Sequence, residues 1–327
     1  MMLKYQPSVF MSARRMSVVG VAIAAVASCK PEQRSVTGLP QVPRSFVAQV
    51  MTSATADWPN EPPGHQEIVW YNGDCRPANP GGCGETGFWY WDSGDSLNMT
   101  SVTVSDAPTS TRDAGQNVLQ TRYPANLAGG TTPVHLVGWI STISHVPNPH
   151  YTQVYVSFWI RFVGSTYEAY PGTNKFGFFG FGSGSGCDYS NDGFFDLRPA
   201  QQGGSQGVIV DQLNLQFQEQ TPVARQIVTS VNIPVGSWHR WELVMRANDL
   251  GSANGLFRWW QDGVLIADYA DVVYLTAGNT HTFYSYTWFP YWGGGTGPIK
   301  SSRDDYVQTD QLYISGLPDP NPPPSCP

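Results

Sequence analysis

One lysine stands alone in an aromatic, glycine-rich stretch, "TNKFGFFGFGSGSG" (173–186), in which Lys175 is the only charged residue. It could be an edge lysine, which keeps an aromatic strand from pairing with other chains. It could also face a ligand-binding cleft. If Phe176 and Phe179 desolvate its ammonium group, burial favours the neutral amine, and the amine can then act as a base. The residues around Lys175 leave both interpretations open.

A second cation, Arg198, lies in "GFFDLRP" (193–199). A guanidinium group binds a carboxylate through two parallel hydrogen bonds. Asp196 would lie on the same face of a strand, so a salt bridge between Asp196 and Arg198 is the structural alternative. If Lys175 and Arg198 face one cleft, Arg198 could hold a carboxylate there and the neutral amine of Lys175 could accept a proton.

The segments that must position these residues show a period of two, which is typical of strands with one apolar and one polar face. In "QVYVSFWIRFV" (153–163) the apolar set alternates with a polar and aromatic set, and "DQLNLQFQEQ" (211–220) and "TFYSYTWFPYW" (282–292) alternate in the same way. Asp262-Gly263 is the residue pair that a two-residue hairpin turn prefers. We therefore predict an all-β fold: an antiparallel β-sandwich of the jelly-roll type with a concave polar and aromatic sheet.

The polar faces of these strands suit a carbohydrate. Amide and guanidinium groups offer fixed donors and acceptors to hydroxyl groups, and aromatic faces stack on pyranose rings. An ordinary solvated face would carry more lysine and glutamate. The predicted substrate-binding set is Tyr155, Trp159, Arg161, Gln212, Asn214, Gln216 and Trp288.

The composition supports short strands joined by turns. Charged residues make up 13% of the 327 residues, about half the usual share of roughly 25%. Aromatic residues also make up 13%, with 34 Gly and 26 Pro, which does not suit a helical bundle or a disordered chain. The net charge of −7 and the lack of basic patches argue against a nucleic-acid partner. We expect a monomer.

The N-terminus resembles a lipoprotein signal, with Arg14 and Arg15 before an apolar run and "VASC" ending at Cys29. The run is too short to span a bilayer as a folded helix, so it is typical of a signal peptide. We predict a signal peptide (1–28), lipidation at Cys29, a tether (29–65), a jelly-roll domain (66–317) and a Pro-rich tail (318–327). The protein would then be extracytoplasmic, as a bacterial cell-envelope lipoprotein or, with an ordinary secretion signal, a secreted protein.

The cysteines are consistent with an exported protein, where disulfides persist. Cys75 and Cys83 flank a turn-rich loop, and we predict that they pair. A bond between Cys187 and Cys326 is an alternative use of the other two cysteines. No zinc-binding spacing occurs, so no cofactor is expected. Oxygen-rich segments around Asp188 and Asp304 give only a weak indication of structural calcium.

Six segments of the chain, taken in order, resemble the concanavalin A-like lectin/glucanase superfamily. They are "VLQTRYPANLAGG", "VYVSFWIRFV", "NKFGFFGFG", "GSWHRWELVMRAND", "NGLFRWWQDGVLIADY" and "DDYVQTDQLYISG", and they span about 200 residues. Within that superfamily they most resemble family 14 polysaccharide lyases, the alginate and glucuronan lyases. The resemblance implies that Lys175 is a catalytic residue in the cleft and that Arg198 holds the substrate carboxylate. That family also uses tyrosines on the following strand, but "DQLNLQFQEQ" contains none. Tyr284 or Tyr286 could substitute if the fold brings them to the same cleft.

The first functional hypothesis is a surface-anchored, lyase-like protein that acts by β-elimination on an acidic (uronate) polysaccharide. The alternative is a non-catalytic carbohydrate-binding lipoprotein of the same fold. Glycoside hydrolysis requires two carboxylates across one bond, and the chain lacks the Glu-x-Asp-x-x-Glu run of related hydrolases. Glu242 is a lone strand acid, which we interpret as a structural partner of Arg240 or Arg246. His239 is likewise interpreted as structural.

Overall fold

The computed structural model describes residues 57–74, 89–94, 96–139, 150–164, 174–180, 192–199, 208–217, 225–275, 282–288, 291–292, 300 and 303–321. All of them belong to one compact unit, Ser53–Pro327. The predicted signal peptide, residues 29–56 of the predicted tether and all five cysteines lie outside the described residues, whereas residues 57–65 are described. Among the residues that are described, no helix is long and apolar enough to cross a membrane.

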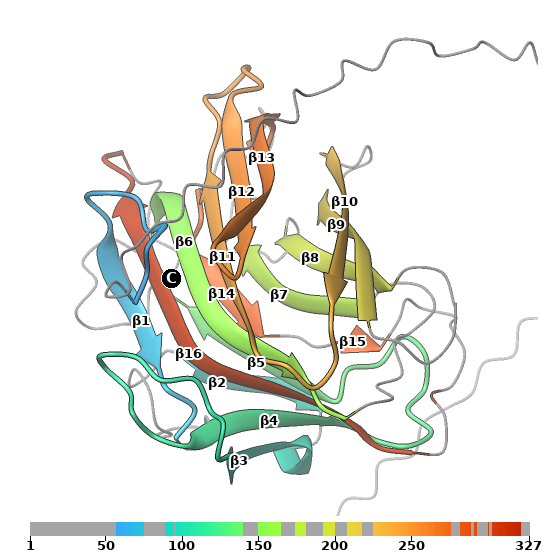
Figure 1. The fold of residues 1–327 in the computed structure, drawn as a ribbon. Helices are drawn as coiled ribbons and strands as arrows, with labels where there is room; N and C mark the ends of the chain where they lie inside the picture. The colour runs from blue at the N-terminus through green and yellow to red at the C-terminus, as the bar shows by residue number, and fades with distance from the viewer. Residues whose placement is uncertain are drawn as a thin grey trace, which may run out of the picture. The chain divides into compact units, whose positions relative to one another are not determined.

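The described part of the chain forms two antiparallel sheets of eight strands each (Figure 1). The first, sheet A, has the order β13-β12-β11-β6-β16-β4-β3, and β1 also pairs with β16. Its strands are β1 (Gln66–Tyr71), β3 (Met99–Thr103), β4 (Asn117–Tyr123), β6 (Tyr151–Phe162), β11 (His239–Arg246), β12 (Gly255–Gln261), β13 (Val264–Val272) and β16 (Asp305–Pro318).

The second, sheet B, has the order β10-β9-β8-β7-β14-β5-β2, and β15 also pairs with β7. Its strands are β2 (Trp89–Gly94), β5 (Val134–Trp139), β7 (Asn174–Gly180), β8 (Asp192–Pro199), β9 (Val208–Phe217), β10 (Arg225–Ile233), β14 (Ser285–Trp288) and β15 (Tyr291–Trp292). A 3₁₀ turn, η1 (Ser96–Asn98), precedes β3. The all-β antiparallel fold predicted from the sequence is therefore confirmed.

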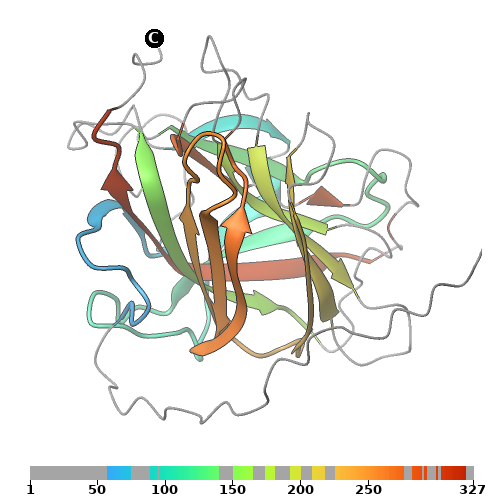
Figure 2. The ribbon, with the colours of Figure 1, turned by 90° about the horizontal axis from the view of Figure 1, so that it is seen from above.

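The core lies between the two sheets, which face each other in Figures 1 and 2. On β6 the alternation predicted from the sequence is observed, because Val154, Val156, Phe158, Ile160 and Phe162 all belong to the core. The ring of Phe158 in sheet A meets the ring of Trp288 in sheet B edge to face, with centroids 6.2 Å apart. This aromatic contact joins the two layers of the sandwich.

The predicted hairpin turn is also present. Asp262 and Gly263 have φ angles of 51° and 78°, the left-handed values that a primed turn requires, and they connect β12 to β13. The carboxylate of Asp262 accepts a hydrogen bond from the backbone N–H of Arg240 (2.8 Å) and lies 2.7 Å from His239 Nδ1. His239 therefore fastens the turn to β11, which supports the structural role predicted for it.

Candidate functional site

The backbone register of sheet B places Lys175 in a polar row across three strands. Lys175 on β7 pairs with Asp196 on β8, and Asp196 pairs with Asn214 on β9. In the next row, Arg198 on β8 pairs with Gln212 on β9. Directly opposed residues share a face, and alternate residues along a strand do so as well. These five positions therefore lie on one face of sheet B.

A register irregularity in β7 decides which face this is. Phe179 pairs with Tyr286 of β14, a core residue, so Phe179 lies at a core position. Regular alternation would put Lys175 on the same side as Phe179. The register shifts between Phe176 and Phe178, however, so that Phe178 and Lys175 oppose the even-numbered positions 194 and 196 of β8. The shift turns the Lys175 position away from the core.

We call this surface of sheet B, turned away from the core, the Lys175 face. Its positions on β7, β8 and β9 are Lys175, Phe178, Gly180, Asp192, Phe194, Asp196, Arg198, Gln212, Asn214 and Gln216. The arrangement brings Lys175 and Arg198 to one surface, as the catalytic hypothesis requires. It also brings three amides beside them, which suits hydroxyl groups. The catalytic and substrate-binding roles of these residues stay predictions.

Three aromatic residues predicted for this site are buried instead. Tyr286 is 1% exposed and Trp288 is 5% exposed, and both belong to the core, on the side of sheet B opposite Lys175. Burial also raises the pKa of Tyr286, so its proton is held more firmly. Tyr284 precedes β14 and is buried beside His150, with ring centroids 5.8 Å apart. The prediction that Tyr286 and Trp288 share a cleft with Lys175 is wrong.

Tyr155, Trp159 and Arg161 lie on β6 of sheet A, whereas Lys175 and the amides lie on sheet B. The prediction that these two groups line a common face is therefore wrong. The alternation within a strand separates its two faces, but it does not tell which sheet the strand joins.

Tyr155 is fully buried in a network built around Glu242. Its hydroxyl donates to Glu242 Oε1 (2.6 Å), and Asn60 donates to both carboxylate oxygens through its backbone N–H (3.2 Å) and its Nδ2 (3.0 Å). Arg240 Nε lies 3.3 Å from Glu242 Oε2, as predicted for a structural pair. Burial and the Glu242 carboxylate raise the pKa of Tyr155 well above its usual value. Tyr155 therefore binds the protein's own carboxylate.

The other two predicted residues on β6 also have partners within the chain. Arg161 donates to Gln308 Oε1 (2.9 Å) and to Asp106 (2.8 Å), and its guanidinium carbon lies 4.7 Å from the Trp238 ring centroid. Trp159 is partly exposed, with the guanidinium carbon of Arg240 5.9 Å from its ring centroid. These contacts account for both side chains without a ligand.

The segment Asp57–Glu61 covers this outer face of sheet A. The Trp58 ring stacks on Tyr313 with centroids 3.7 Å apart, and the Tyr313 hydroxyl donates to Glu61 (2.8 Å). The guanidinium carbon of Arg112 lies 5.5 Å and 4.7 Å from the ring centroids of Trp58 and Trp70. Sheet A is thus covered where its polar and aromatic residues gather.

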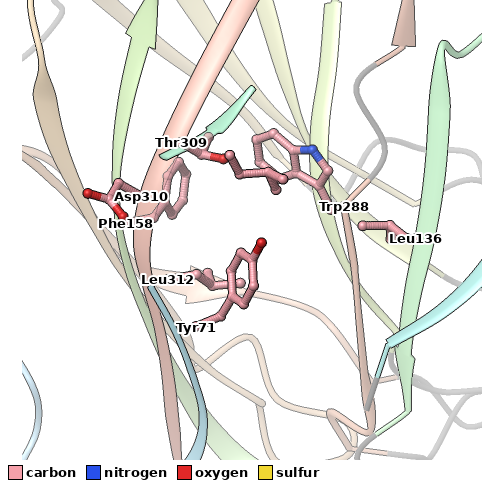
Figure 3. Close-up of a pocket in the computed structure, with 8 residues that line it drawn as sticks. Tyr71, Leu136, Phe158, Trp288, Thr309, Asp310 and Leu312 are labelled. Atoms are coloured by element: carbon pink, nitrogen blue, oxygen red, sulfur yellow. The ribbon is translucent and has the colours of Figure 1, made fainter. Parts of the chain in front are cut away.

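A cavity between the sheets is the other candidate site (Figure 3). Its lining residues are Tyr71, Leu119, Leu136, Phe158, Trp288, Thr309, Asp310 and Leu312. Its volume is about 20 Å³, enough for a water molecule but far too small for a sugar ring. The cavity therefore cannot be the carbohydrate site, and the Lys175 face is the better candidate.

Asp310 is a buried carboxyl group at the wall of this cavity. It is 2% exposed, and burial together with Asp113 and Asp74 raises its pKa to about 8, although the backbone N–H of Gln311 donates to it at 2.9 Å. Gln311 has a φ of 51° where the pairing of β16 with β6 shifts register.

Within the described ranges, no group of three or more His, Cys, Asp and Glu residues could hold a metal ion.

Two of the aspartates that gave the weak indication of calcium, Asp304 and Asp305, contact groups of the protein itself. Asp304 accepts a hydrogen bond from the backbone N–H of Ala125 (2.7 Å), and Asp305 lies 2.7 Å from Lys300 Nζ. Asp188 lies outside the described residues.

Comparison with known proteins supports the fold. No protein-family model matches the sequence, and no curated protein matches it. Among solved structures, the alginate lyase Aly36B is 15% identical, with 80% of this chain and 100% of that chain covered and a TM-score of 0.54. A glucuronan lyase from the fungus Trichoderma reesei is 16% identical (77% and 96% covered, TM-score 0.49). A family 14 alginate lyase from Aplysia kurodai is 14% identical (71% and 90% covered, TM-score 0.48).

The fold is therefore an all-β jelly roll like that of the alginate lyase Aly36B. The likeness to Aly36B confirms the predicted resemblance at the level of the fold.

The Glu242 network gives a test of the role of Tyr155. Tyr155→Phe removes a donor from a buried carboxylate, so we expect the free energy of unfolding to fall by about 1–3 kcal/mol. Urea unfolding measures this loss. Tyr313→Phe is the matched control and should cost less, because its partner Glu61 is partly exposed. A Tyr155→Phe variant of unchanged stability that binds glycans more weakly would contradict the structural role.

From the raised pKa of Asp310 we predict that the protein loses stability as the pH rises from acidic to weakly alkaline values. Because its pKa is raised to about 8 from 3.8, the folded state binds a proton that the unfolded state releases, and stability falls as the pH rises from 3.8 through about 8. Asp310→Asn mimics the neutral form, so its Tm should fall less than that of the wild type between about pH 5 and 9. Asp268→Asn, which removes an exposed partner of Arg258, should keep the wild-type pH dependence. Parallel curves for wild type and Asp310→Asn would refute the prediction.

Proposed function

We propose that the protein is a surface-anchored, lyase-like protein that cleaves an acidic (uronate) polysaccharide by β-elimination at the Lys175 face. The observation that carries this proposal is the register of β7, β8 and β9, which gathers Lys175, Arg198 and three amides on one surface. The fold shared with an alginate lyase supports it.

Arg198 has the chemistry to hold the substrate carboxylate. Its guanidinium offers two parallel donors, and the bond strengthens as negative charge moves onto the carboxylate when the C5 proton leaves. Gln212, in the same row, and Asn214, in the next row, offer amide groups to the neighbouring hydroxyls. In this proposal these residues orient the uronate and make its C5 proton acidic.

Lys175 would act first as the base and then as the acid. Its neutral amine takes the proton from C5, the electrons of that bond form a C4=C5 double bond, and the C4–O bond breaks. The departing oxygen then takes a proton from the Lys175 ammonium, which restores the amine. Burial keeps the phenols of Tyr284 and Tyr286 from a ligand on the Lys175 face. Tyr291 of β15, which pairs with Lys175 in the register, is the alternative acid for the departing oxygen.

A non-catalytic carbohydrate-binding protein of the same fold is the second candidate. The observation that favours it is Asp196, which pairs with Lys175 in the backbone register. A carboxylate opposite a lysine favours the charged ammonium, and an ammonium is not a base. Retention of a glycan without cleavage would identify this candidate.

The proposal also includes the location of the protein and its attachment to the cell envelope. Lipidation of Cys29 would anchor a monomer at the bacterial cell envelope, outside the cytoplasm, and Cys75 and Cys83 would form a disulfide. Cys29→Ser would release the protein into the soluble fraction if the anchor is a lipid on that sulfur.

Lys175→Ala tests the catalytic role. Wild-type protein given alginate or glucuronan should produce the unsaturated-uronate absorbance at about 235 nm. Lys175→Ala should lower that rate by at least about 10²-fold while the glycan stays bound, because it removes the proton-transfer group but not the carboxylate clamp. Arg198→Ala should weaken binding as well as cleavage. Arg258→Ala, on sheet A, is the matched control and should behave as wild type.

Each outcome of this assay decides between the candidates. Cleavage that survives Lys175→Ala contradicts the catalytic assignment. A wild-type protein that binds these glycans without any absorbance is the non-catalytic alternative. A wild-type protein that neither binds nor cleaves a uronate glycan contradicts the proposed function.

A further inference from the structure

Asp196 occupies the position between the two cations of the Lys175 face. It is directly opposite Lys175 in the β7–β8 pair and two residues from Arg198 on β8. Directly opposed residues on one face have Cβ atoms about 4.5–5.5 Å apart, and diagonal neighbours are about 7–8 Å apart. The position of Asp196 is therefore next to the positions of both Lys175 and Arg198.

This placement limits what the cations can bind. A uronate carboxylate that approaches Lys175 and Arg198 must compete with Asp196, and it also meets an acid of like charge. Such a repulsive element lowers the affinity for unwanted partners and so creates specificity. One uronate held by Arg198 can outweigh this cost, but the described positions of β7, β8 and β9 on this face offer no further arginine or lysine that could clamp a second uronate.

The next strand offers amides where a polyuronate would need cations. The β9 positions on this face are Gln212, Asn214 and Gln216, and on β10 Gln226 pairs with Asn214. Neighbouring strands lie about 4.8 Å apart, which is close to the length of one pyranose unit along a glycan. A glycan that crosses the strands would place one sugar over the cations of β7 and β8 and the next over the amides of β9.

We propose that Asp196 is a specificity-determining residue that selects polysaccharides in which a uronate alternates with a neutral sugar, and that it disfavours uninterrupted polyuronates. This inference rests on the proposed function, since it concerns the same face. It adds a substrate class and assigns a role to an acid that has no part in the elimination itself.

The test compares two hexasaccharides of equal length by calorimetric titration: hyaluronan, which alternates glucuronate with N-acetylglucosamine, and oligoglucuronate. Wild-type protein should bind the alternating probe about tenfold more tightly. Asp196→Asn keeps the shape of the side chain and removes its charge from the uronate site that both probes occupy, so it should tighten the binding of both. The gain for oligoglucuronate, whose second uronate also meets Asp196, should be about tenfold larger than the gain for hyaluronan, so the preference should disappear.

Asp192→Asn is the matched control. Asp192 lies on the same strand and, by alternation, on the same face, but its partner on β7 is Gly180 and not a cation. It should leave both affinities unchanged, and equal Tm values would show that all variants fold alike.

The outcomes separate this inference from the proposed function. If wild type binds both probes equally and Asp196→Asn changes nothing, the inference is wrong and the proposed function stands. If Asp196→Asn weakens the binding of oligoglucuronate, Asp196 is a ligand of the sugar and the inference is also wrong. If neither wild type nor Asp196→Asn binds either probe, both the inference and the proposed function fail.

Discussion

The register between β7 and β8 is the constraint on which the functional surface depends. A shift of one residue along a strand moves its side chains to the other face. Between Phe176 and Phe178 such a shift occurs within one strand, so that Phe176 and Phe179 keep core positions while Lys175 comes to lie on the opposite face. A regular strand would have put Lys175 between the sheets, where an unpaired ammonium group is costly. The local irregularity therefore serves both the core and the site.

The two sheets use their outer faces differently. On sheet A the polar and aromatic residues contact other residues of the same chain. Glu242 accepts hydrogen bonds from Tyr155 and Asn60, and Trp58 stacks on Tyr313. Buried carboxylates require such partners, because a charge without them is strongly disfavoured in the interior. On sheet B the register instead gathers two cations, two acids and three amides on a face turned away from the core. The chemistry proposed for the protein is thus assigned to one sheet, and the other provides stability.

The sequence predicts the parts of this fold that depend on local patterns. The alternation in β6 identified its core residues, and Asp262-Gly263 identified a hairpin turn. It could not assign strands to sheets, because Tyr155 and its partner Glu242 are 87 positions apart and meet only in the folded chain. Nor could it tell which side of β14 is buried, so Tyr286 and Trp288 were placed wrongly. Asp196 was recognised as a neighbour of Arg198, but its position opposite Lys175 follows only from the register.

The most direct test of this account is a crystal structure of the Lys175→Ala variant with a bound uronate oligosaccharide. The account predicts that the sugar lies across β7, β8 and β9 on the surface turned away from the core, with a carboxylate within hydrogen-bonding distance of Arg198. A sugar bound on sheet A, or a structure in which positions 175 and 198 lie on opposite faces of sheet B, would contradict it.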